Sequence, residues 1–430
     1  MRVSIFKLVL AKSITALSVY VSNDNLKLCE SINYIVEFFN LMNAPVKKNN
    51  SIYMFVKDIT LDGGCERVVV NMVNEFIKHY SYVHILSNFQ SNLEINYKID
   101  DQVKIHYLHP NISLHEWEKK HIFSILFKIT FIHNFVYSLC FTSKLYRYIR
   151  KSNPMKYQAI VMFHGYQTAW YKKSGIKLVG VDHSNFPYDK TNLKNKLGKL
   201  KFWIESFMNR KLDIVTCLTN AEIDYWRLLG RPIFIMPNFV SIIPEIIPSF
   251  ESRSNKIISM GRMNTNQKGF DLLIHAFAKI AHKIPNWELE IYGNGHFKSK
   301  YNYIIKKLNI QNQVKIKDFT KNPQEIFLST SIFVLCSRSE GFGLVLAEAM
   351  ACGMAAIAYE NTGPNAIIKN NYSGILVPNG NEEILCKKLI MLIRNTKFRK
   401  EISIKSRKNV IKNFSPNIII GKWIEIFDLI

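Results

Sequence analysis

Short apolar runs rich in β-branched residues alternate with stretches of helical periodicity along most of the chain. Between residues 51 and 238 these runs read IYMFVKDI, VHILSN, VKIHYL, AIVMFHG, KLVGVD, DIVTCLT and PIFIMPN. Strands that alternate with helices build a parallel sheet, because each helix carries the chain back to the start of the next strand. The pattern therefore predicts an α/β domain over residues 51–238.

A stretch rich in Pro and Ser interrupts this alternation, MPNFVSIIPEIIPSFESRSN, and the pattern then restarts with KIISMGRM, ELEIYGNG, VKIKDF, SIFVLCS, AAIAYE and GILVPNG. A second α/β domain is predicted over residues 239–415. Residues 416–430 begin with Pro after a Ser and keep apolar residues at helical spacing, so they predict a closing helix. Two Rossmann-like domains in tandem face each other across a central cleft, where open α/β sheets bind ligands.

Residues 1–50 precede the first predicted strand and are either an N-terminal extension or a misassigned start, with Met42 as the alternative start. Their beginning is basic and apolar like a signal peptide. However, Lys7 and Lys12 interrupt the apolar stretch, and no A-x-A cleavage site follows. The chain is therefore expected to be cytoplasmic.

The chain is strongly basic, with 57 Lys and Arg against 33 Asp and Glu and a formal net charge of +24. Such an excess predicts an acidic partner, which could be nucleic acid, a phosphorylated metabolite or an anionic membrane surface. The 7 cysteines show no C-x-x-C spacing, which is typical of reduced thiols in a cytosolic protein.

Two carboxylates flank a Gly-Phe-Gly turn in the segment SRSEGFGLVLAEAMACGM. Glu340 precedes a predicted helix, and Glu348 lies more than one turn inside it. Carboxylates bind sugar hydroxyls well, and the free N–H groups at a helix start beside Gly341 and Gly343 suit a pyrophosphate. The alternative is a solvated helix whose N-terminal acid only favours the helix dipole.

The segment GRMNTNQKGFDLLIHAF follows the first strand of the second domain. It holds Arg262 and Lys268 in a loop between Gly261 and Gly269. Two cations at the mouth of a sheet can neutralise a diphosphate leaving group. A single surface cation is more often only solvated, but these two and the acidic pair together form a candidate site.

The ordered set of motifs resembles a retaining GT-B glycosyltransferase of family 4, from about residue 51 to the end. The segment DGGCERVVVNM resembles the first Gly-rich loop of that family, CLTNAEIDYW and IMPN its domain junction, and GRMNTNQKG its phosphate loop. SEGFGLVLAEAMACGM and TGPNAII resemble its donor signature. The resemblance implies a GT-B fold in which residues 51–238 bind the acceptor and residues 239–415 the nucleotide-sugar donor.

The resemblance also assigns roles. Arg262 and Lys268 are expected to contact the donor diphosphate, Glu340 the sugar hydroxyls and Glu348 the ribose. His183, in GVDHSNF, resembles the histidine that faces the transferred sugar, although a lone histidine is more often structural. The remaining expected donor contacts come from Gly63, Gly64, Gly261, Gly341, Phe342 and Gly343.

Some positions depart from the family pattern. Ala366 stands where an acid is common, and Thr320 where a glycine is common. The sequence contains no D-x-D motif, the carboxylate arrangement that holds a metal on the nucleotide sugar in the other major glycosyltransferase fold. Neither a metal nor a cofactor is therefore expected, and cationic side chains and helix N–H groups replace the metal.

The implied activity is that of a hexosyltransferase. It would move a sugar from a nucleotide sugar, expected to be UDP-linked, to a glycan or lipid-linked oligosaccharide of a bacterial surface polysaccharide. A GT-B nucleotide-sugar epimerase is the alternative. A basic nucleic-acid-binding protein is a third hypothesis, but neither a helix-turn-helix nor an aromatic RNA-binding motif is found, so no nucleic-acid partner is expected.

Residues 190–211 contain seven basic residues, one internal acid and apolar residues at helical spacing. This pattern resembles a helix that lies on an anionic membrane, which would place a peripheral enzyme at the inner face of the cytoplasmic membrane. A core-facing helix with a solvated basic face fits the pattern equally well.

Overall fold

The computed structural model describes residues 47–61, 63–113, 116, 144–145, 147–149, 158–162, 175–182, 207, 209–228, 230–320 and 322–430. The chain divides into two compact units, Met1–Lys48 and Asn49–Ile430, and both sheets belong to the second. The predicted extension or misassigned start at residues 1–50 lies outside the described residues, apart from residues 47–50. Strand β1 (Lys48–Asp58) begins at Lys48 instead of residue 51.

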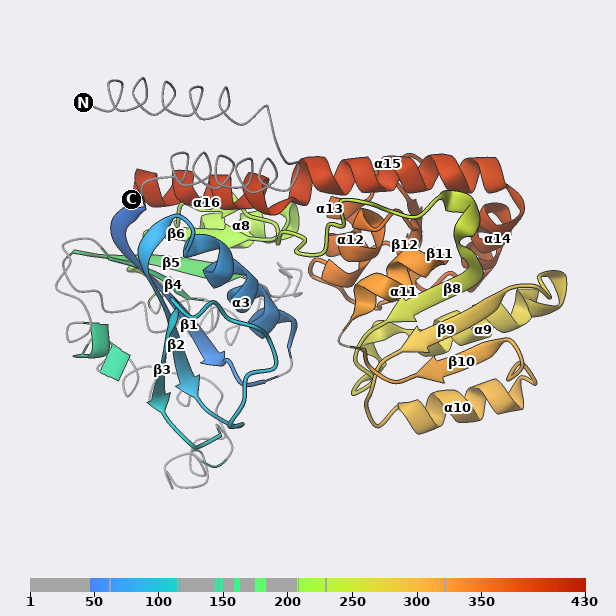
Figure 1. Ribbon diagram of the computed structural model, residues 1–430, viewed down its shortest axis with the longest axis horizontal. Helices are drawn as coiled ribbons and strands as arrows, with labels where there is room; N and C mark the ends of the chain where they lie inside the picture. Colours follow the sequence, from blue (N-terminus) through green and yellow to red (C-terminus); the bar gives the residue numbers. More distant parts are fainter. Residues whose placement is uncertain are drawn as a thin grey trace, which may run out of the picture. The chain divides into compact units, whose positions relative to one another are not determined.

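The first sheet has the strand order β3-β2-β1-β4-β5-β6-β7 (Figure 1). Its strands after β1 are β2 (Tyr80–Phe89), β3 (Lys104–His109), β4 (Gln158–Met162), β5 (Ile176–Asp182), β6 (Ile214–Cys217) and β7 (Ile233–Ile235). Helix α3 (Gly64–Phe76) follows β1, and η3 (Asn220–Glu222) and α8 (Ile223–Leu228) follow β6. The strand pairings described for this sheet are parallel.

The second sheet has the order β10-β9-β8-β11-β12-β13 and is parallel throughout. Its strands are β8 (Ser254–Met260), β9 (Glu288–Tyr292), β10 (Val314–Lys317), β11 (Thr330–Leu335), β12 (Ala355–Tyr359) and β13 (Ile375–Val377). The strand order reverses at β1 in the first sheet and at β8 in the second. The chain connections therefore leave in opposite directions on the two sides of each of these strands. Ligands of doubly wound folds bind at this switch point.

Helices cover both faces of the second sheet. Phe270, Leu273 and Phe277 of α9 (Phe270–Ile280) share one buried cluster with Leu385 and Leu389 of α14 (Glu382–Arg394). Residues of α12 (Leu344–Ala351) form the core on the other face. The remaining helical segments are η4 (Phe250–Ser252), η5 (Asn266–Lys268), η6 (Ala281–Lys283), α10 (Lys298–Lys307), α11 (Pro323–Ser329), α13 (Thr362–Ile367) and α15 (Thr396–Phe414).

The last helix returns to the first domain. Helix α16 (Pro416–Leu429) places its buried residues in the core of the first sheet and α3, namely Ile419, Ile420, Trp423, Ile426 and Phe427. The Trp423 ring lies 6.3 Å from that of Phe76 on α3. The end of the chain therefore completes the core of the first domain.

The predicted fold class is confirmed: the protein has two parallel α/β domains of the Rossmann type. The first sheet ends with β7 and the second begins with β8, so the predicted boundary at 238 and 239 falls in the connecting segment. None of the helices within the described ranges combines the length and hydrophobicity that crossing a bilayer requires.

Replacing Trp423 by Ala should destabilise the first domain, because it empties a buried site that its neighbours fill only in part. We expect a loss of about 3–5 kcal/mol in the free energy of unfolding, measured by denaturant titration. Ile418 lies on the same helix but is 44% exposed, so Ile418→Ala is the matched control and should cost much less. Equal losses in the two variants would contradict the assignment of α16 to this core.

Candidate active site

The switch point of the second sheet lies between β8 and β11. The loop after β8 carries Lys268, and the loop after β11 carries Glu340. Because these are neighbouring parallel strands, both loops emerge at the same edge of the sheet. Two segments that lie far apart in the sequence therefore meet where the fold binds ligands.

Lys268 and Glu340 are in direct contact. The Lys268 Nζ atom lies 2.6 Å from Oε2 of Glu340, and the Ser337 hydroxyl donates to the same oxygen at 3.0 Å. Both ionic side chains are largely screened from solvent. A cation and a carboxylate held side by side can bind an anionic group and a hydroxyl of one elongated ligand.

A second ion pair ties the two loops together. The Arg338 guanidinium donates to both carboxylate oxygens of Asp271, at 2.9 and 2.8 Å, and to the carbonyl of Asn266 at 2.7 Å. The Arg338 N–H donates to the Gln267 carbonyl at 2.7 Å, and the Gln267 amide donates to the Ser339 carbonyl at 3.0 Å. These contacts fix the short η5 turn, and with it Lys268, against the segment that carries Glu340.

Two glycines are required by this packing. Gly269 has φ +65°, and a Cβ atom there would lie 1.9 Å from the carbonyl oxygen of Cys336. Gly343 has φ +92° and caps the start of α12. Both backbone conformations are readily open only to glycine, so these residues allow the loops after β8 and β11 to approach each other.

The turn at Gly341, Phe342 and Gly343 is buried and leads into α12. The Phe342 side chain is buried in the core, with its ring 5.6 Å from that of Phe414. The turn is also tied to α13, because the Gly363 N–H donates to the Glu340 carbonyl at 3.0 Å. The Phe342 side chain therefore belongs to the core of the second domain.

Arg262 lies on the same loop as Lys268 but outside the ion pair that Lys268 forms with Glu340. The preceding residue, Gly261, is anchored because its N–H donates to the Tyr292 carbonyl at 3.0 Å. The Arg262 side chain is exposed, and within the described part of the chain it has no ion pair. The structure therefore does not bring Arg262 into the Lys268–Glu340 pair.

Glu348 is buried on α12 and contacts the first domain. Its Oε1 atom forms an ion pair with the guanidinium of Arg67, which lies in the first turn of α3. Burial raises the pKa of Glu348, while the charge and hydrogen bond of Arg67 lower it. Sequence reasoning missed Arg67, although it stands within the Gly-rich motif, because one cation on an amphipathic helix looks like a solvated residue.

Gly63 and Gly64 lie after β1, beside the switch point of the first sheet. A Cβ atom on Gly63 would collide with the Glu66 carboxylate, whereas one on Gly64 would meet no atom within 4 Å. The folded chain therefore leaves the backbone at Gly64 open. His183, which follows the end of β5, lies outside the described residues.

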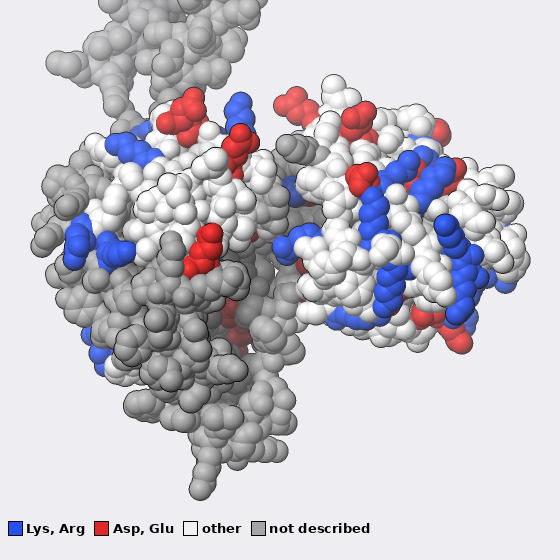
Figure 2. All heavy atoms as spheres, turned by 90° about the horizontal axis from the view of Figure 1, so that it is seen from below, with Lys and Arg blue, Asp and Glu red and all other residues white. Residues whose placement is uncertain are grey.

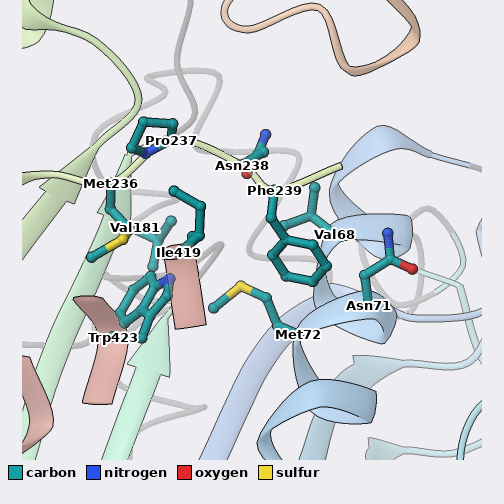
Figure 3. Close-up of a pocket in the computed structure, with 10 residues that line it drawn as sticks. All are labelled: Val68, Asn71, Met72, Val181, Met236, Pro237, Asn238, Phe239, Ile419 and Trp423. Atoms are coloured by element: carbon teal, nitrogen blue, oxygen red, sulfur yellow. The ribbon is translucent and has the colours of Figure 1, made fainter. Parts of the chain in front are cut away.

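A small cavity of about 10 Å³ lies in the first domain beside the end of β5 (Figure 3). This volume is close to the minimum for one water molecule, so the cavity is too small for a sugar or a nucleotide. Its walls come from α3, the end of β5, the segment after β7 and α16, and the side chains around it include Met72, Val181, Met236, Phe239 and Trp423.

Basic side chains are not confined to the predicted membrane segment. Figure 2 shows Lys and Arg gathered on one face of the second domain. On α10 and the neighbouring edge strand β10 the exposed lysines are Lys300, Lys306, Lys307, Lys315 and Lys317. Most of residues 190–211 lie outside the described residues, so the predicted amphipathic helix there stays a prediction.

The described residues contain no cluster of three or more His, Cys, Asp or Glu that could hold a metal ion. Among the described residues, Cys217, Cys336, Cys352 and Cys386 are free thiols.

Comparison with known proteins agrees with this architecture. Residues 62–242 match the family model described as Glycosyltransferase Family 4, and residues 245–409 match the model described as Glycosyl transferases group 1. The structure of TarM from Staphylococcus aureus, in a complex that includes UDP, covers 88% of this chain and 100% of that chain with a TM-score of 0.67 and 18% identity. The chain belongs to the GT-B glycosyltransferases.

Relatives by sequence carry glycosyltransferase names. An uncharacterized glycosyltransferase of Haemophilus influenzae is 26% identical over 86% of this chain and 98% of its own length. The poly(ribitol-phosphate) alpha-N-acetylglucosaminyltransferase of Staphylococcus aureus is 30% identical over 57% of this chain, which spans 49% of that protein. A Campylobacter jejuni N-acetylgalactosaminyltransferase, whose name includes an undecaprenol-linked glycan, is 25% identical over 59% of this chain and 69% of its own.

Asp271→Asn should weaken the tie between the two loops and destabilise the second domain. Burial would raise the pKa of Asp271, but the hydrogen bonds and charge of Arg338 outweigh burial and hold that pKa below its usual value. Because Arg338 is partly exposed, we expect a loss of only about 1–2 kcal/mol near neutral pH.

The pH dependence gives the sign of this effect. A carboxylate with a lowered folded-state pKa stabilises the protein above its unfolded pKa of about 4, and the contribution is lost as the pH falls through the folded-state pKa. The difference in unfolding free energy between the protein and Asp271→Asn should therefore shrink below about pH 4. A difference that stays constant with pH would contradict an ionised Asp271.

Proposed function

We propose that the protein transfers a hexose-type sugar from a UDP-linked donor to a glycan or lipid-linked glycan, with retention of the anomeric configuration. The product would be a bacterial surface polysaccharide such as O-antigen, capsule or exopolysaccharide. The observation that carries this proposal is the contact between Lys268 and Glu340 at the switch point of the second sheet. The names of the relatives support a glycan or lipid-linked acceptor.

The chemistry follows from where charge develops. Breaking the bond between the anomeric carbon and the phosphate builds negative charge on the diphosphate and positive charge on the sugar. Lys268, Arg262 and the N–H groups at the start of α12 stabilise the diphosphate, while Glu340 binds sugar hydroxyls. Glu348 serves the ribose, and the backbone at Gly63, Gly64 and Gly261 contacts the donor.

Retention follows if the acceptor hydroxyl attacks from the side of the leaving group. A bond then forms between the acceptor oxygen and the anomeric carbon, and the acceptor proton passes to a phosphate oxygen of the departing diphosphate. His183 faces the transferred sugar in this proposal. Charge neutralisation by side chains and helix N–H groups needs neither a metal nor a cofactor beyond the nucleotide sugar.

The acceptor chemistry suggests work at the cytoplasmic side of the membrane, with residues 190–211 against anionic lipid. Each lysine close to an anionic membrane surface contributes about 1 kcal/mol to such binding. The exposed lysines of α10 and β10 offer a second basic surface, which the experiment below separates from the first.

A thermal-shift screen with UDP, GDP, ADP and TDP and their sugars should identify the donor, because a ligand that binds only the folded protein raises its melting temperature. Lys268→Ala and Glu340→Ala should then lower transfer from that donor by about a hundredfold or more with little change in folding. Transfer is measured as nucleotide release that depends on added lipid-linked glycan. Formation of a sugar product from the donor alone, without any acceptor, would favour an epimerase.

Lys279→Ala is the matched control, since Lys279 also pairs with a carboxylate, that of Glu382, but lies exposed on α9 away from the switch point. It should leave transfer unchanged. Normal turnover in Lys268→Ala or Glu340→Ala would remove the site assignment. Absence of any nucleotide shift in folded protein would count against a nucleotide-sugar donor.

For the membrane contact, replacing Lys194, Lys196, Lys199 and Lys201 by Gln should release the protein from anionic vesicles in a sedimentation assay. The matched control replaces Lys300, Lys306, Lys307 and Lys315 by Gln and should leave most protein bound. Loss of binding in the control alone would move the contact to the second domain, and unchanged binding in both would end the membrane proposal.

A further inference from the structure

Arg67 joins the first domain to the candidate donor site. It lies in the first turn of α3, close behind Gly63 and Gly64. Its guanidinium forms an ion pair and a hydrogen bond with Oε1 of Glu348, which belongs to α12 of the second domain. The Glu348 side chain is 1% exposed and that of Arg67 is 26% exposed. Arg67 of the first domain therefore pairs with the buried Glu348 of the second domain.

The Arg67 cation offsets part of the effect that burial has on the Glu348 carboxylate. Burial raises the pKa of Glu348, and only the charge and hydrogen bond of Arg67 act in the opposite direction. Cys352 lies at the end of the same helix, and its thiol stays neutral because burial raises its pKa to about 12. The arginines nearby, Arg253 and Arg407, donate to the carbonyls of Cys352 and Ala351 instead.

The second oxygen of Glu348 has no such contact. Oε2 is buried, and it has no hydrogen-bond partner among the described residues. Buried polar atoms are nearly always paired, so an unpaired carboxylate oxygen marks a place where a donor group is missing. A ribose hydroxyl is a donor of the right kind, since it can give a hydrogen bond to an ionised carboxylate.

We propose that Arg67 is a positioning residue for nucleotide recognition, which holds the Glu348 carboxylate through Oε1 and leaves Oε2 to accept a ribose hydroxyl. This inference rests on the proposed nucleotide-sugar donor. Oε2 is closed to solvent in this structure, so the residues around it have to shift for the ribose to reach it. The first domain thereby takes part in binding the nucleoside.

Calorimetry on the full chain tests this role. The probes are the ribonucleotide among UDP, GDP and ADP that binds the unaltered protein best, and the 2′,3′-dideoxy form of the same nucleotide. Arg67→Met should weaken binding of the ribonucleotide by about tenfold or more, the scale of a charge-assisted hydrogen bond. It should leave binding of the dideoxy form unchanged, and Arg67→Lys should restore part of the loss.

The pH dependence supplies a second readout. Without Arg67 the pKa of Glu348 rises further, so its ionised form is lost at a higher pH. The preference for the ribonucleotide over the dideoxy form should therefore fall off at a higher pH in Arg67→Met than in the unaltered protein. Taking the ratio of the two nucleotides cancels the titration of their shared phosphates.

The control is Lys78→Met, which removes a cation just beyond the same helix. Lys78 is 60% exposed and pairs with Glu75, so this variant should bind both nucleotides normally. Equal weakening for both nucleotides in Arg67→Met would mean that Arg67 acts on the phosphates, and tighter binding would mean that it only competes with the ligand. Either result, or no change, overturns the inference. If no nucleotide binds the folded, unaltered protein, the proposed function itself fails, and this inference with it.

Discussion

The candidate site depends on one constraint, which is that parallel strands bring their carboxyl ends to a single edge of a sheet. In the second domain the strand order reverses between β8 and β11, so the loops after these strands lie side by side while their helices leave in opposite directions. The tie between Arg338 and Asp271 then fixes the distance between the loops. The hydrogen bonds between Gln267 and residues 338 and 339 hold the same two loops together, so the contact of Lys268 with Glu340 has a fixed frame.

Much of this arrangement could be predicted from the sequence, because it follows from local pattern. Each β-branched run of the second domain predicted a strand, and both loops that carry candidate residues end such a run. The sequence grouped the two cations and the acidic pair into one candidate site, and the structure brings Lys268 and Glu340 together.

Other features could not be predicted, because they join residues that no local pattern relates. Arg67 and Glu348 are 281 residues apart, and Arg67 looks ordinary on its own helix. The exposed position of Arg262 depends on how the whole loop after β8 folds. The neighbouring Gly261 and Lys268, which the sequence analysis used, do not determine that fold. The role of His183 stays a prediction, since that residue lies outside the described part of the chain.

The buried charged residues of the second domain differ in which groups stabilise them. Arg253 is buried, and its guanidinium donates to the carbonyls of Phe327, Thr330 and Cys352. Arg399 is also buried and donates to the carbonyls of Leu392 and Ile393. These cations are held by backbone acceptors of their own domain. The Glu348 carboxylate instead depends on a residue of the other domain and keeps one oxygen unpaired.

The return of α16 to the first domain has a consequence for how the protein is made. The ribosome finishes the strands of the first sheet long before it adds Trp423 and Phe427, which complete the core beside α3. Until those residues emerge, the apolar face of α3 has no cover from α16, while the second domain can already fold. The domain that is synthesised first is thus the last to be completed, and a nascent chain stalled before residue 416 would need a chaperone to shield that face.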